Sequence, residues 1–312
     1  MTRPRIAVLD DYQNAALASA DWSAVQERAD VVVFHDHIDD EASLAMRLAP
    51  FDAVCVMRER TPVTGSLIAA LPRLRLIAST GKANASIDLD AARAHGVRVA
   101  HTGYTSTPTI EFAWAAIMAL ARGIAPEVAS VRAGGWQVGL GTELHGKTLA
   151  ILGLGSIGSR IARIGQAFGM QVIAWSENLT EETAAALGVR RVTREALFAE
   201  ADFLTIHTRL SERTLGLVGV AELAAMKPSA RLVNTSRGPI VDEDALVDAL
   251  RTGRLAGAAV DVYGTEPLPA AHPFRTLPNV MATPHIGYVT EEMYRTFYAD
   301  TVKNLIEWLD AR

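Results

Sequence analysis

The sequence has very little cysteine: Cys55 is the only one among 312 residues, so no disulfide can form within the chain. Cys55 lies inside the apolar run 53–57, where a small buried hydrophobic side chain is a better interpretation than a reactive thiol. A chain without internal disulfides suits a reducing compartment. We therefore expect a cytoplasmic protein.

Hydrophobic runs long enough to cross a membrane are also lacking. The most apolar predicted helix, 112–121, is flanked by Glu111 and Arg122 and falls short of the about 20 residues that a spanning helix needs. The start of the chain leads directly into a strand pattern at residues 5–9, without the apolar segment and cleavage site of a signal peptide. We therefore expect no membrane partner.

Neither sign of charge dominates the sequence. Thirty Lys and Arg against 35 Asp and Glu give a net charge of −5, which provides no basic surface for nucleic acid. The composition is 49% hydrophobic and 21% charged, which predicts a substantial core and argues against extensive disorder. At 312 residues, two domains are a better expectation than one.

Short apolar runs alternate with helical patterns through most of the chain, which predicts βαβ units and parallel sheets. In the first hundred residues we predict strands at 5–9, 31–34, 53–57, 74–79 and 97–100, with helices near 13–28, 41–49 and 88–95. A helix at 108–122 is followed by predicted strands at 148–152, 171–175, 202–207, 230–234, 257–261 and 280–282, and by helices at 242–251 and 290–309. The first hundred residues are therefore predicted to form a small α/β domain of their own.

The rest of the chain is organised around the glycine-rich stretch Gly153-Leu-Gly155-Ser-Ile-Gly158, which lies between the predicted strand 148–152 and a helical pattern. In this context the first glycine makes a tight turn, the second lets the backbone approach a pyrophosphate, and the third lets helix and strand pack closely. The free N–H groups at the start of the helix then face the phosphates. The stretch predicts a dinucleotide-binding site.

Three side chains suited to catalysis follow predicted strands in the same half of the chain: Arg237, Glu266 and His285. Ligands of open α/β sheets bind beyond the carboxyl ends of the strands. A histidine can donate a proton to a developing alkoxide, a glutamate on its other ring nitrogen favours the imidazolium, and an arginine can bind a carboxylate through its planar fork. These are the groups that hydride transfer to a carbonyl needs, although a structural histidine, a loop cap and a cofactor-phosphate ligand are the alternative interpretations.

The sequence resembles the D-isomer-specific 2-hydroxyacid dehydrogenase family over essentially its whole length. Besides the glycine turn, the motifs that carry the resemblance are, in order, Val233-Asn-Thr-Ser-Arg-Gly238, Asp261-Val-Tyr-Gly-Thr-Glu-Pro-Leu268 and Pro278-Asn-Val-Met-Ala-Thr-Pro-His-Ile-Gly287. The resemblance implies that Arg237 binds a 2-oxo acid, that His285 is the acid/base and that Glu266 is its partner. The implied reaction transfers a hydride between NAD(P)H and a 2-oxo acid, giving a D-2-hydroxy acid.

The same resemblance implies an architecture. A Rossmann-type, doubly wound dinucleotide domain is expected over residues 101–283. A smaller, flavodoxin-like α/β substrate domain is expected from residues 1–100 together with a returning C-terminal helix in 284–312. Members of the family are usually dimers joined through the dinucleotide domain, so we expect a homodimer.

The resemblance and the positions of residues after strands together suggest which residues contact the ligands. The candidate substrate contacts are Arg58, Gly81, Lys82, Arg237 and His285. Arg58 is included because it follows the third predicted strand and Lys82 because it lies in the loop that receives the carboxylate, with a solvated side chain as the alternative for both. The implied cofactor contacts are Gly153, Gly155, Ser156, Ile157, Gly158, Ser176, Glu177, His207, Thr208, Thr235, Ser236, Arg237, Asp261, His285 and Gly287. One departure concerns the loop that receives the substrate carboxylate on backbone N–H groups: the family usually has Gly-x-Gly there, and this chain keeps only Gly81.

A second departure concerns the choice between NAD and NADP. Ser176, at the end of the strand after the glycine turn, replaces an aspartate that is frequent in the family. A serine admits a 2′-phosphate, but the carboxylate of Glu177 would repel one. Arg190 and Arg191 are the cations that would bind a phosphate instead. We favour NAD and keep NADP as the alternative.

The sequence leaves two rival functions open. A 3-phosphoglycerate dehydrogenase resembles the same motifs, although many of those enzymes carry an additional regulatory domain that is not expected here. A dinucleotide-sensing, corepressor-like binding protein would keep the site residues without turnover of keto acids. His35 and His37 lie near Asp39, but we interpret them as a strand leaving into a polar loop and expect no metal.

Overall fold

The computed structural model describes residues 3–312, which form two compact units. Unit 1 runs to Thr105 and resumes over Val289–Arg312, and unit 2 is Ser106–Tyr288. The boundaries expected from the sequence, after residues 100 and 283, fall slightly earlier than these. The difference assigns His285 and Gly287 to unit 2.

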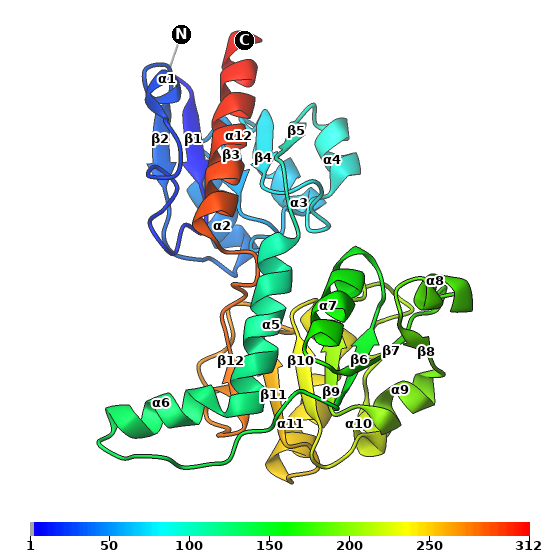
Figure 1. Cartoon of the computed structure of the whole chain (residues 1–312). Helices are drawn as coiled ribbons and strands as arrows, with labels where there is room; N and C mark the ends of the chain where they lie inside the picture. The colour runs from blue at the N-terminus through cyan, green and yellow to red at the C-terminus, as the bar shows by residue number, and fades with distance from the viewer. Residues whose placement is uncertain (1–2) are drawn as a thin grey trace. The chain divides into compact units, whose positions relative to one another are not determined.

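Unit 1 is a parallel five-stranded sheet in the order β2-β1-β3-β4-β5, the flavodoxin-like order. Its strands are β1 (Arg5–Val8), β2 (Asp30–Val33), β3 (Ala53–Val56), β4 (Leu76–Ser79) and β5 (Arg98–His101). Its helices are α1 (Ser23–Gln26), α2 (Glu41–Leu48), α3 (Gly65–Ala69), α4 (Leu89–Ala94) and the long α12 (Glu291–Asp310), drawn in red in Figure 1.

Unit 2 is a parallel seven-stranded sheet in the order β12-β11-β10-β9-β6-β7-β8. The chain leaves β6 toward one edge and returns at β9 to continue toward the other, as in a Rossmann-type doubly wound sheet, which confirms the predicted fold class. The strands are β6 (Thr148–Leu152), β7 (Gln171–Trp175), β8 (Arg190–Arg191), β9 (Phe203–Ile206), β10 (Arg231–Asn234), β11 (Gly257–Val260) and β12 (Val280–Ala282). The helices are α5 (Thr107–Arg122), α6 (Ile124–Arg132), α7 (Ser156–Ala167), α8 (Glu181–Ala185), α9 (Arg194–Glu200), α10 (Val220–Ala225) and α11 (Glu243–Arg251), with short 3-10 turns η1 (Gly238–Ile240) and η2 (Pro273–Arg275).

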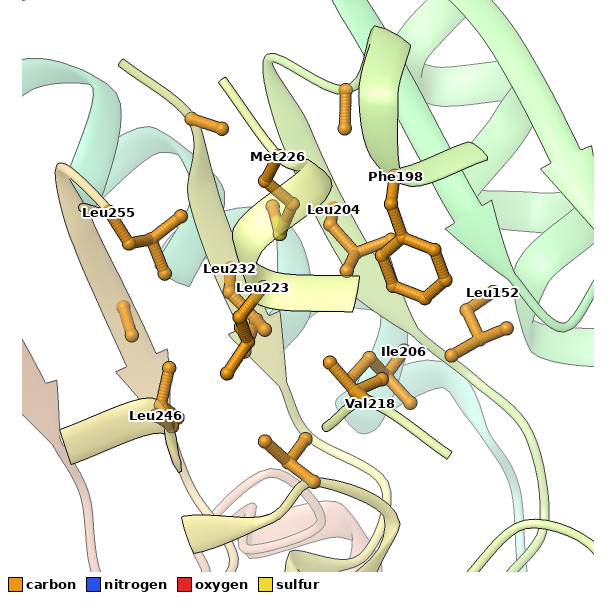
Figure 2. Packing of buried hydrophobic residues seen from close by; sticks show 14 of the residues in the cluster. Leu152, Phe198, Leu204, Ile206, Val218, Leu223, Met226, Leu232, Leu246 and Leu255 are labelled. Atoms are coloured by element: carbon orange, nitrogen blue, oxygen red, sulfur yellow. The ribbon is translucent and has the colours of Figure 1, made fainter. Parts of the chain in front are cut away.

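Both faces of the unit 2 sheet are covered by apolar side chains. Because successive strand residues point to opposite faces, Leu152 of β6 joins one core and Ile151 the other. Figure 2 shows the first core, where Leu152 and Leu232 of the sheet lie in one cluster with Phe198 of α9 and Leu223 of α10. Helices α5, α7 and α8 cover the second face.

The helix predicted over residues 13–28 is wrong for most of its length: only α1, from Ser23 to Gln26, is helical there. The physical reason is local. The buried carboxylate of Asp11 accepts hydrogen bonds from the backbone N–H groups of Ala15 and Ala16, and Asn14 adopts a positive φ of 53°. A side chain that satisfies backbone N–H groups in this way competes with helix formation.

Cys55 lies in β3 and is buried, as the sequence predicts. Burial raises the pKa of its thiol to about 12. Within residues 3–312, no single helix is both long and apolar enough to span a bilayer. Helices α5 and α6 reach the required length and hydropathy only when joined, and they are bent by 67°.

His37 belongs to a polar cluster in unit 1. Its Nδ1 lies 2.8 Å from Oδ1 of the buried Asp10, and its Nε2 lies 3.0 Å from Oδ1 of Asp39. The hydrogen bond to Asp10 outweighs the cost of burial and raises the pKa of His37 above its ordinary value of 6.5. Across the described residues, no group of three or more His, Cys, Asp and Glu is arranged as a metal site.

We expect His37→Gln to destabilise the protein more in mild acid than in mild base. Because the folded-state pKa is raised, the stabilisation by His37 is fully present below about pH 6.5 and is lost as the pH rises through the folded-state value. Thermal melts at pH 5.5 and pH 8.5 measure the difference. His35→Gln, at a more exposed histidine of the same segment, is the control, and an equal loss of Tm at both pH values for His37→Gln would contradict the expectation.

Candidate active site

The glycine turn joins β6 to α7 at the point where the unit 2 sheet reverses its strand order. Gly153 has φ +102°, and a Cβ there would lie 2.7 Å from the backbone carbonyl carbon of His207. A Cβ on Gly158 would lie 2.1 Å from the carbonyl oxygen of Gly153. A Cβ on Gly155 would meet nothing within 4 Å. Two of the three glycines are therefore required by packing, and the space beside Gly155 is open.

The start of α7 suits a phosphate. Gly155 is its N-cap, so no side chain accepts a hydrogen bond from the first N–H groups of the helix. These groups and the helix dipole attract an anion. A second indication of a ligand lies just after β10, where Oγ1 of the buried Thr235 has no hydrogen-bond partner among residues 3–312. An open glycine turn, an uncapped helix and an orphaned hydroxyl fit a bound dinucleotide.

The residues that would face the cofactor ribose are held close to this turn. Oγ of Ser176, just after β7, accepts a hydrogen bond of 2.9 Å from the backbone N–H of Leu154. Glu177 is exposed beside it. The two arginines considered as phosphate ligands have other partners: Arg190 pairs with Glu200, and Nε of Arg191 donates to the carbonyl of Leu179 at 2.7 Å. An exposed carboxylate therefore lies beside Ser176, and both arginines considered as phosphate ligands are engaged elsewhere in the described structure.

Arg237 follows β10 and is held by its own turn. The buried side chain of Asn234 donates to the carbonyl oxygen of Arg237 at 3.0 Å and accepts from the N–H of Ser236 at 3.1 Å. The guanidinium Nη1 donates to the Ser236 carbonyl at 2.7 Å. Gly238 follows, and a Cβ there would lie 2.1 Å from the carbonyl carbon of Tyr263. The loop with Arg237 thus packs backbone to backbone on the segment that carries Glu266.

His285 lies in a loop folded around a buried carboxylate. Oδ1 of Asp261 accepts hydrogen bonds from Oγ1 of Thr283 at 2.7 Å and from the N–H of Ile286 at 2.9 Å. Its Oδ2 accepts from the N–H of Gly287 at 2.8 Å. These bonds enclose His285, which adopts a left-handed φ of 52° that a non-glycine residue rarely takes. Burial raises the pKa of Asp261 above 3.8 despite its three donors.

The imidazole of His285 pairs with Glu266. Nδ1 lies 2.6 Å from Oε2 of Glu266, and the other carboxylate oxygen accepts from the N–H of Tyr263 at 2.9 Å. Burial opposes ionisation of Glu266, but the hydrogen bond and charge of His285, the Tyr263 N–H and the charge of Arg237 together hold the pKa of the carboxyl below 4.5. The ring of His285 meets that of Tyr288 edge to face at 5.6 Å between centroids.

The structure therefore brings the three predicted catalytic side chains together within unit 2. Nε2 of His285 has no hydrogen-bond partner among the described residues, while Nδ1 is fixed by Glu266. A carboxylate can only accept, so Nδ1 carries a proton, and Nε2 is the nitrogen that exchanges one. The site can therefore hold a proton on Nε2 of His285, and the charge of Arg237 acts on the Glu266 carboxylate that pairs with it.

His207 differs from His285 in its electrostatics. Its Nε2 lies 2.8 Å from Oγ1 of Thr205, and burial lowers its pKa to about 4. A histidine with this pKa is neutral at physiological pH and is poorly suited to donate a proton.

The predicted substrate contacts of unit 1 form a second cluster. Arg58 has φ 54°, and its Nη1 lies 3.4 Å from the carbonyl oxygens of Thr80 and of Ala83. A Cβ on Gly81 would lie 1.8 Å from this nitrogen, so the guanidinium lies directly on the loop. The N–H of Gly81 donates to Oγ1 of Thr102 at 2.7 Å, whereas the backbone N–H groups of Lys82 and Ala83 make no hydrogen bond within the described residues.

Two positioning side chains, Asn234 and Tyr263, lie inside the sequence motifs, but the sequence gives no sign of their roles. The hydroxyl of Tyr263 lies 2.9 Å from the carbonyl oxygen of Val260 and 2.7 Å from that of Thr283, which joins the loops of Glu266 and His285. The carboxylate of Asp261, predicted as a cofactor contact, accepts from the His285 loop instead of remaining open.

Comparison with known proteins supports the same family from three sides. The sequence model described as the NAD binding domain of D-isomer specific 2-hydroxyacid dehydrogenases matches residues 114–287. A glyoxylate reductase from Aeropyrum pernix is 41% identical over 256 residues, covering 79% of this chain and 76% of the relative. A D-3-phosphoglycerate dehydrogenase from Synechocystis is 38% identical over 268 residues, covering 85% of this chain and 48% of the relative, so the chain spans about half the length of that enzyme.

The fold agrees with a solved structure over its whole length. A phosphoglycerate oxidoreductase from Vibrio cholerae superposes with a TM-score of 0.92 at 39% identity, covering 99% of this chain and 100% of that one. The glycine turn, the strand-end side chains and these matches point the same way. The chain belongs to the D-isomer specific 2-hydroxyacid dehydrogenase family, whose members are NAD-dependent oxidoreductases that act on the CH–OH group of 2-hydroxy acids.

Proposed function

We propose that this enzyme reduces a small, unphosphorylated 2-oxo acid to the D-2-hydroxy acid with NADH, using His285 as the acid/base. The observation that carries the proposal is the His285–Glu266 pair, 2.6 Å apart, with Nε2 of His285 open and the charge of Arg237 acting on the same carboxylate. When bound, NADH supplies the hydride.

The roles of the side chains follow from their chemistry. Glu266 favours the imidazolium form of His285, whose Nε2 gives its proton to the carbonyl oxygen as charge develops there. Solvent then returns a proton to Nε2. Arg237 presents a planar fork that binds the substrate carboxylate and polarises the carbonyl. In unit 1, the backbone N–H groups of Lys82 and Ala83 are donors for a carboxylate.

The cations of unit 1 support a substrate without a phosphate. Nη2 of Arg58 lies 3.5 Å from Oε1 of Glu59, and its Nη1 is on the loop carbonyls. Arg60 donates to the carbonyl of Asp10 at 2.7 Å and lies over the ring of Tyr12. Both guanidiniums thus have protein partners, which leaves fewer of their N–H donors for a second anionic group. The relatives named phosphoglycerate dehydrogenases make 3-phosphoglycerate the second candidate substrate.

Steady-state assays with one panel of acids test the proposal. NADH oxidation is followed with glyoxylate, hydroxypyruvate, pyruvate, a bulkier 2-oxo acid and 3-phosphohydroxypyruvate. The products of all acids except glyoxylate, whose product glycolate is achiral, are resolved by chiral chromatography. We expect the highest kcat/KM with a small unphosphorylated acid. A kcat/KM at least tenfold higher for 3-phosphohydroxypyruvate would replace the proposed substrate class.

For the cofactor, we expect Glu177→Arg to raise kcat/KM for NADPH by about tenfold, equivalent to about 1.4 kcal/mol, because a cation would replace the exposed carboxylate near the 2′ position. Glu177→Gln is the matched control, which removes the repulsion without adding a cation and should give a smaller gain. Fluorescence titration of both reduced cofactors gives Kd independently of turnover. A wild type that already prefers NADPH tenfold would contradict the repulsion argument.

We also propose that the enzyme is a homodimer. Support comes from α6 and the segment after it, which extend from the end of α5 (Figure 1) and expose apolar side chains. Trp136 is 75% exposed and Leu140 is 99% exposed. A second copy of the chain would cover this surface. Sedimentation velocity tests this, and a monomer at micromolar concentration would refute it.

A cytoplasmic location is a further proposal, supported by the single buried cysteine. Fractionation of cells that express the protein at its natural level tests it. Recovery in a membrane or secreted fraction would contradict it.

A further inference from the structure

A second histidine–carboxylate pair lies in the segment that carries Glu266. Nε2 of His272 lies 3.0 Å from Oε1 of Glu243, and the other oxygen of Glu243 accepts a hydrogen bond of 3.1 Å from the N–H of Gly264. Glu243 is the first residue of α11, whereas Gly264 and His272 lie on either side of Glu266 in the chain. One carboxylate therefore ties the start of a helix to both sides of the Glu266 loop.

The tautomer of His272 follows from its two contacts. Nδ1 accepts a hydrogen bond of 3.2 Å from the N–H of Phe274, so this nitrogen carries no proton. The proton of the neutral ring is on Nε2 and is donated to Glu243. If Nδ1 carried a proton, its N–H would point at the N–H of Phe274. The geometry therefore fits the neutral ring, with its proton on Nε2. His285 has the opposite arrangement, since its Nδ1 donates and its Nε2 is open.

The remaining contacts of the segment leave Glu266 little freedom. The guanidinium of Arg275 donates to the carbonyl oxygens of Leu268 and Pro269 at 2.6 and 2.9 Å. The rings of His272 and Phe274 are 4.7 Å apart. A displacement at Gly264 would be passed to Glu266 through a short stretch of chain whose far end is fixed.

We propose that Glu243 and His272 are positioning residues that hold Glu266 against Nδ1 of His285. The inference rests on the proposed acid/base role of His285. Among the described residues, the charge of Arg237 reaches Glu266 and that of Asp261 interacts with His285. Arg237 comes from the loop after β10, and Asp261, which directly precedes the segment, is tied by its own hydrogen bonds to the His285 loop. Loosening the segment at Gly264 and His272 therefore acts first on Glu266.

Two substitutions of His272 separate its two contacts. Asn in His272→Asn keeps an acceptor where Nδ1 accepts from Phe274 but lacks the donor that reaches Glu243. Gln in His272→Gln places an amide donor close to Nε2 and lacks the acceptor. We expect His272→Asn to lower kcat by about 3- to 10-fold and to move the basic limb of the reduction pH profile to lower pH by about 0.3–0.5 units. His272→Gln should keep the wild-type profile.

A merely structural role would give a different result: both variants would lose Tm, and neither would shift the pH profile. A double-variant experiment is decisive. On the Glu266→Gln background, His272→Asn should add no further shift, because the group that it positions has lost its charge. An additional shift of equal size would overturn the inference, as would a shift in His272→Gln alone.

The experiment also separates this inference from the proposed function. If Glu266→Gln shifts the profile and His272→Asn does not, the positioning role is wrong and the His285–Glu266 assignment stands. If Glu266→Gln itself produces no shift, the assignment fails and this inference fails with it. Should His272→Asn not fold, Glu243→Gln gives the same readout, because an amide retains only one acceptor oxygen for two donors.

Discussion

Replacing His285 with alanine is expected to lower kcat for 2-oxo acid reduction by about 10²–10⁴, with little change in the Kd of NADH. The reason is the arrangement of its two nitrogens. Nδ1 is committed to Glu266 at 2.6 Å, so only Nε2 can exchange a proton with the substrate. Removing the ring removes a proton donor whose position is fixed by Glu266.

The measurement pairs single-turnover kinetics with a fluorescence titration of NADH, so that chemistry and cofactor binding are read separately. His95→Ala is the control, since His95 is an exposed residue at the end of α4 in unit 1 and has no assigned role. A His285→Ala enzyme that turns over within tenfold of wild type would remove the acid/base assignment.

Replacing Glu266, the partner of His285, is expected to shift the pH profile in a defined direction. Glu266→Gln removes the charge that stabilises the imidazolium, so the proton-donating form is lost at a lower pH than in the wild type. The basic limb of the reduction profile and the rising limb of the oxidation profile should therefore both move to lower pH. A shift in only one direction of the reaction would point to a rate-limiting step other than proton transfer.

The elements nearest the site were predictable because their signals are local. The strands predicted at 148–152 and 171–175 have the bounds of β6 and β7, and the glycine turn lies between β6 and α7 as expected. Apolar runs, turn glycines and strand ends are readable within a window of about 15 residues. The strand-end rule then placed Arg237, Glu266 and His285 at one edge of a sheet.

The contacts that position those side chains were not predictable, because they join residues far apart in the sequence. Asp261 bonds to Ile286 across 25 positions, and Glu243 bonds to His272 across 29. From the sequence alone, an aspartate whose carboxylate accepts hydrogen bonds from backbone N–H groups cannot be distinguished from one that binds a cofactor. The false helix over 13–28 has a related cause, since one aspartate side chain took up the N–H groups that a helix would have used.

Arg237→Lys is expected to lower kcat/KM for the 2-oxo acid by about 10²-fold, through a higher KM and a lower kcat, with little change in NADH affinity. The substitution keeps the positive charge but loses the planar fork that can bind a carboxylate with two parallel hydrogen bonds. A lost charge-assisted hydrogen bond costs about 1.5–3 kcal/mol, or about 10- to 150-fold, and the expected factor lies in the upper part of this range. The backbone should be unaffected, because Asn234 holds the turn through the carbonyl oxygen of Arg237.

Arg231→Lys provides the matched control for this prediction. Arg231 lies at the opposite end of the same strand, β10, where its guanidinium packs over the ring of Phe203. We expect kcat/KM of Arg231→Lys to stay within about twofold of wild type. The decisive comparison is between substrate and cofactor: if Arg237→Lys weakens NADH binding and leaves KM for the acid unchanged, Arg237 is a ligand of the cofactor phosphates.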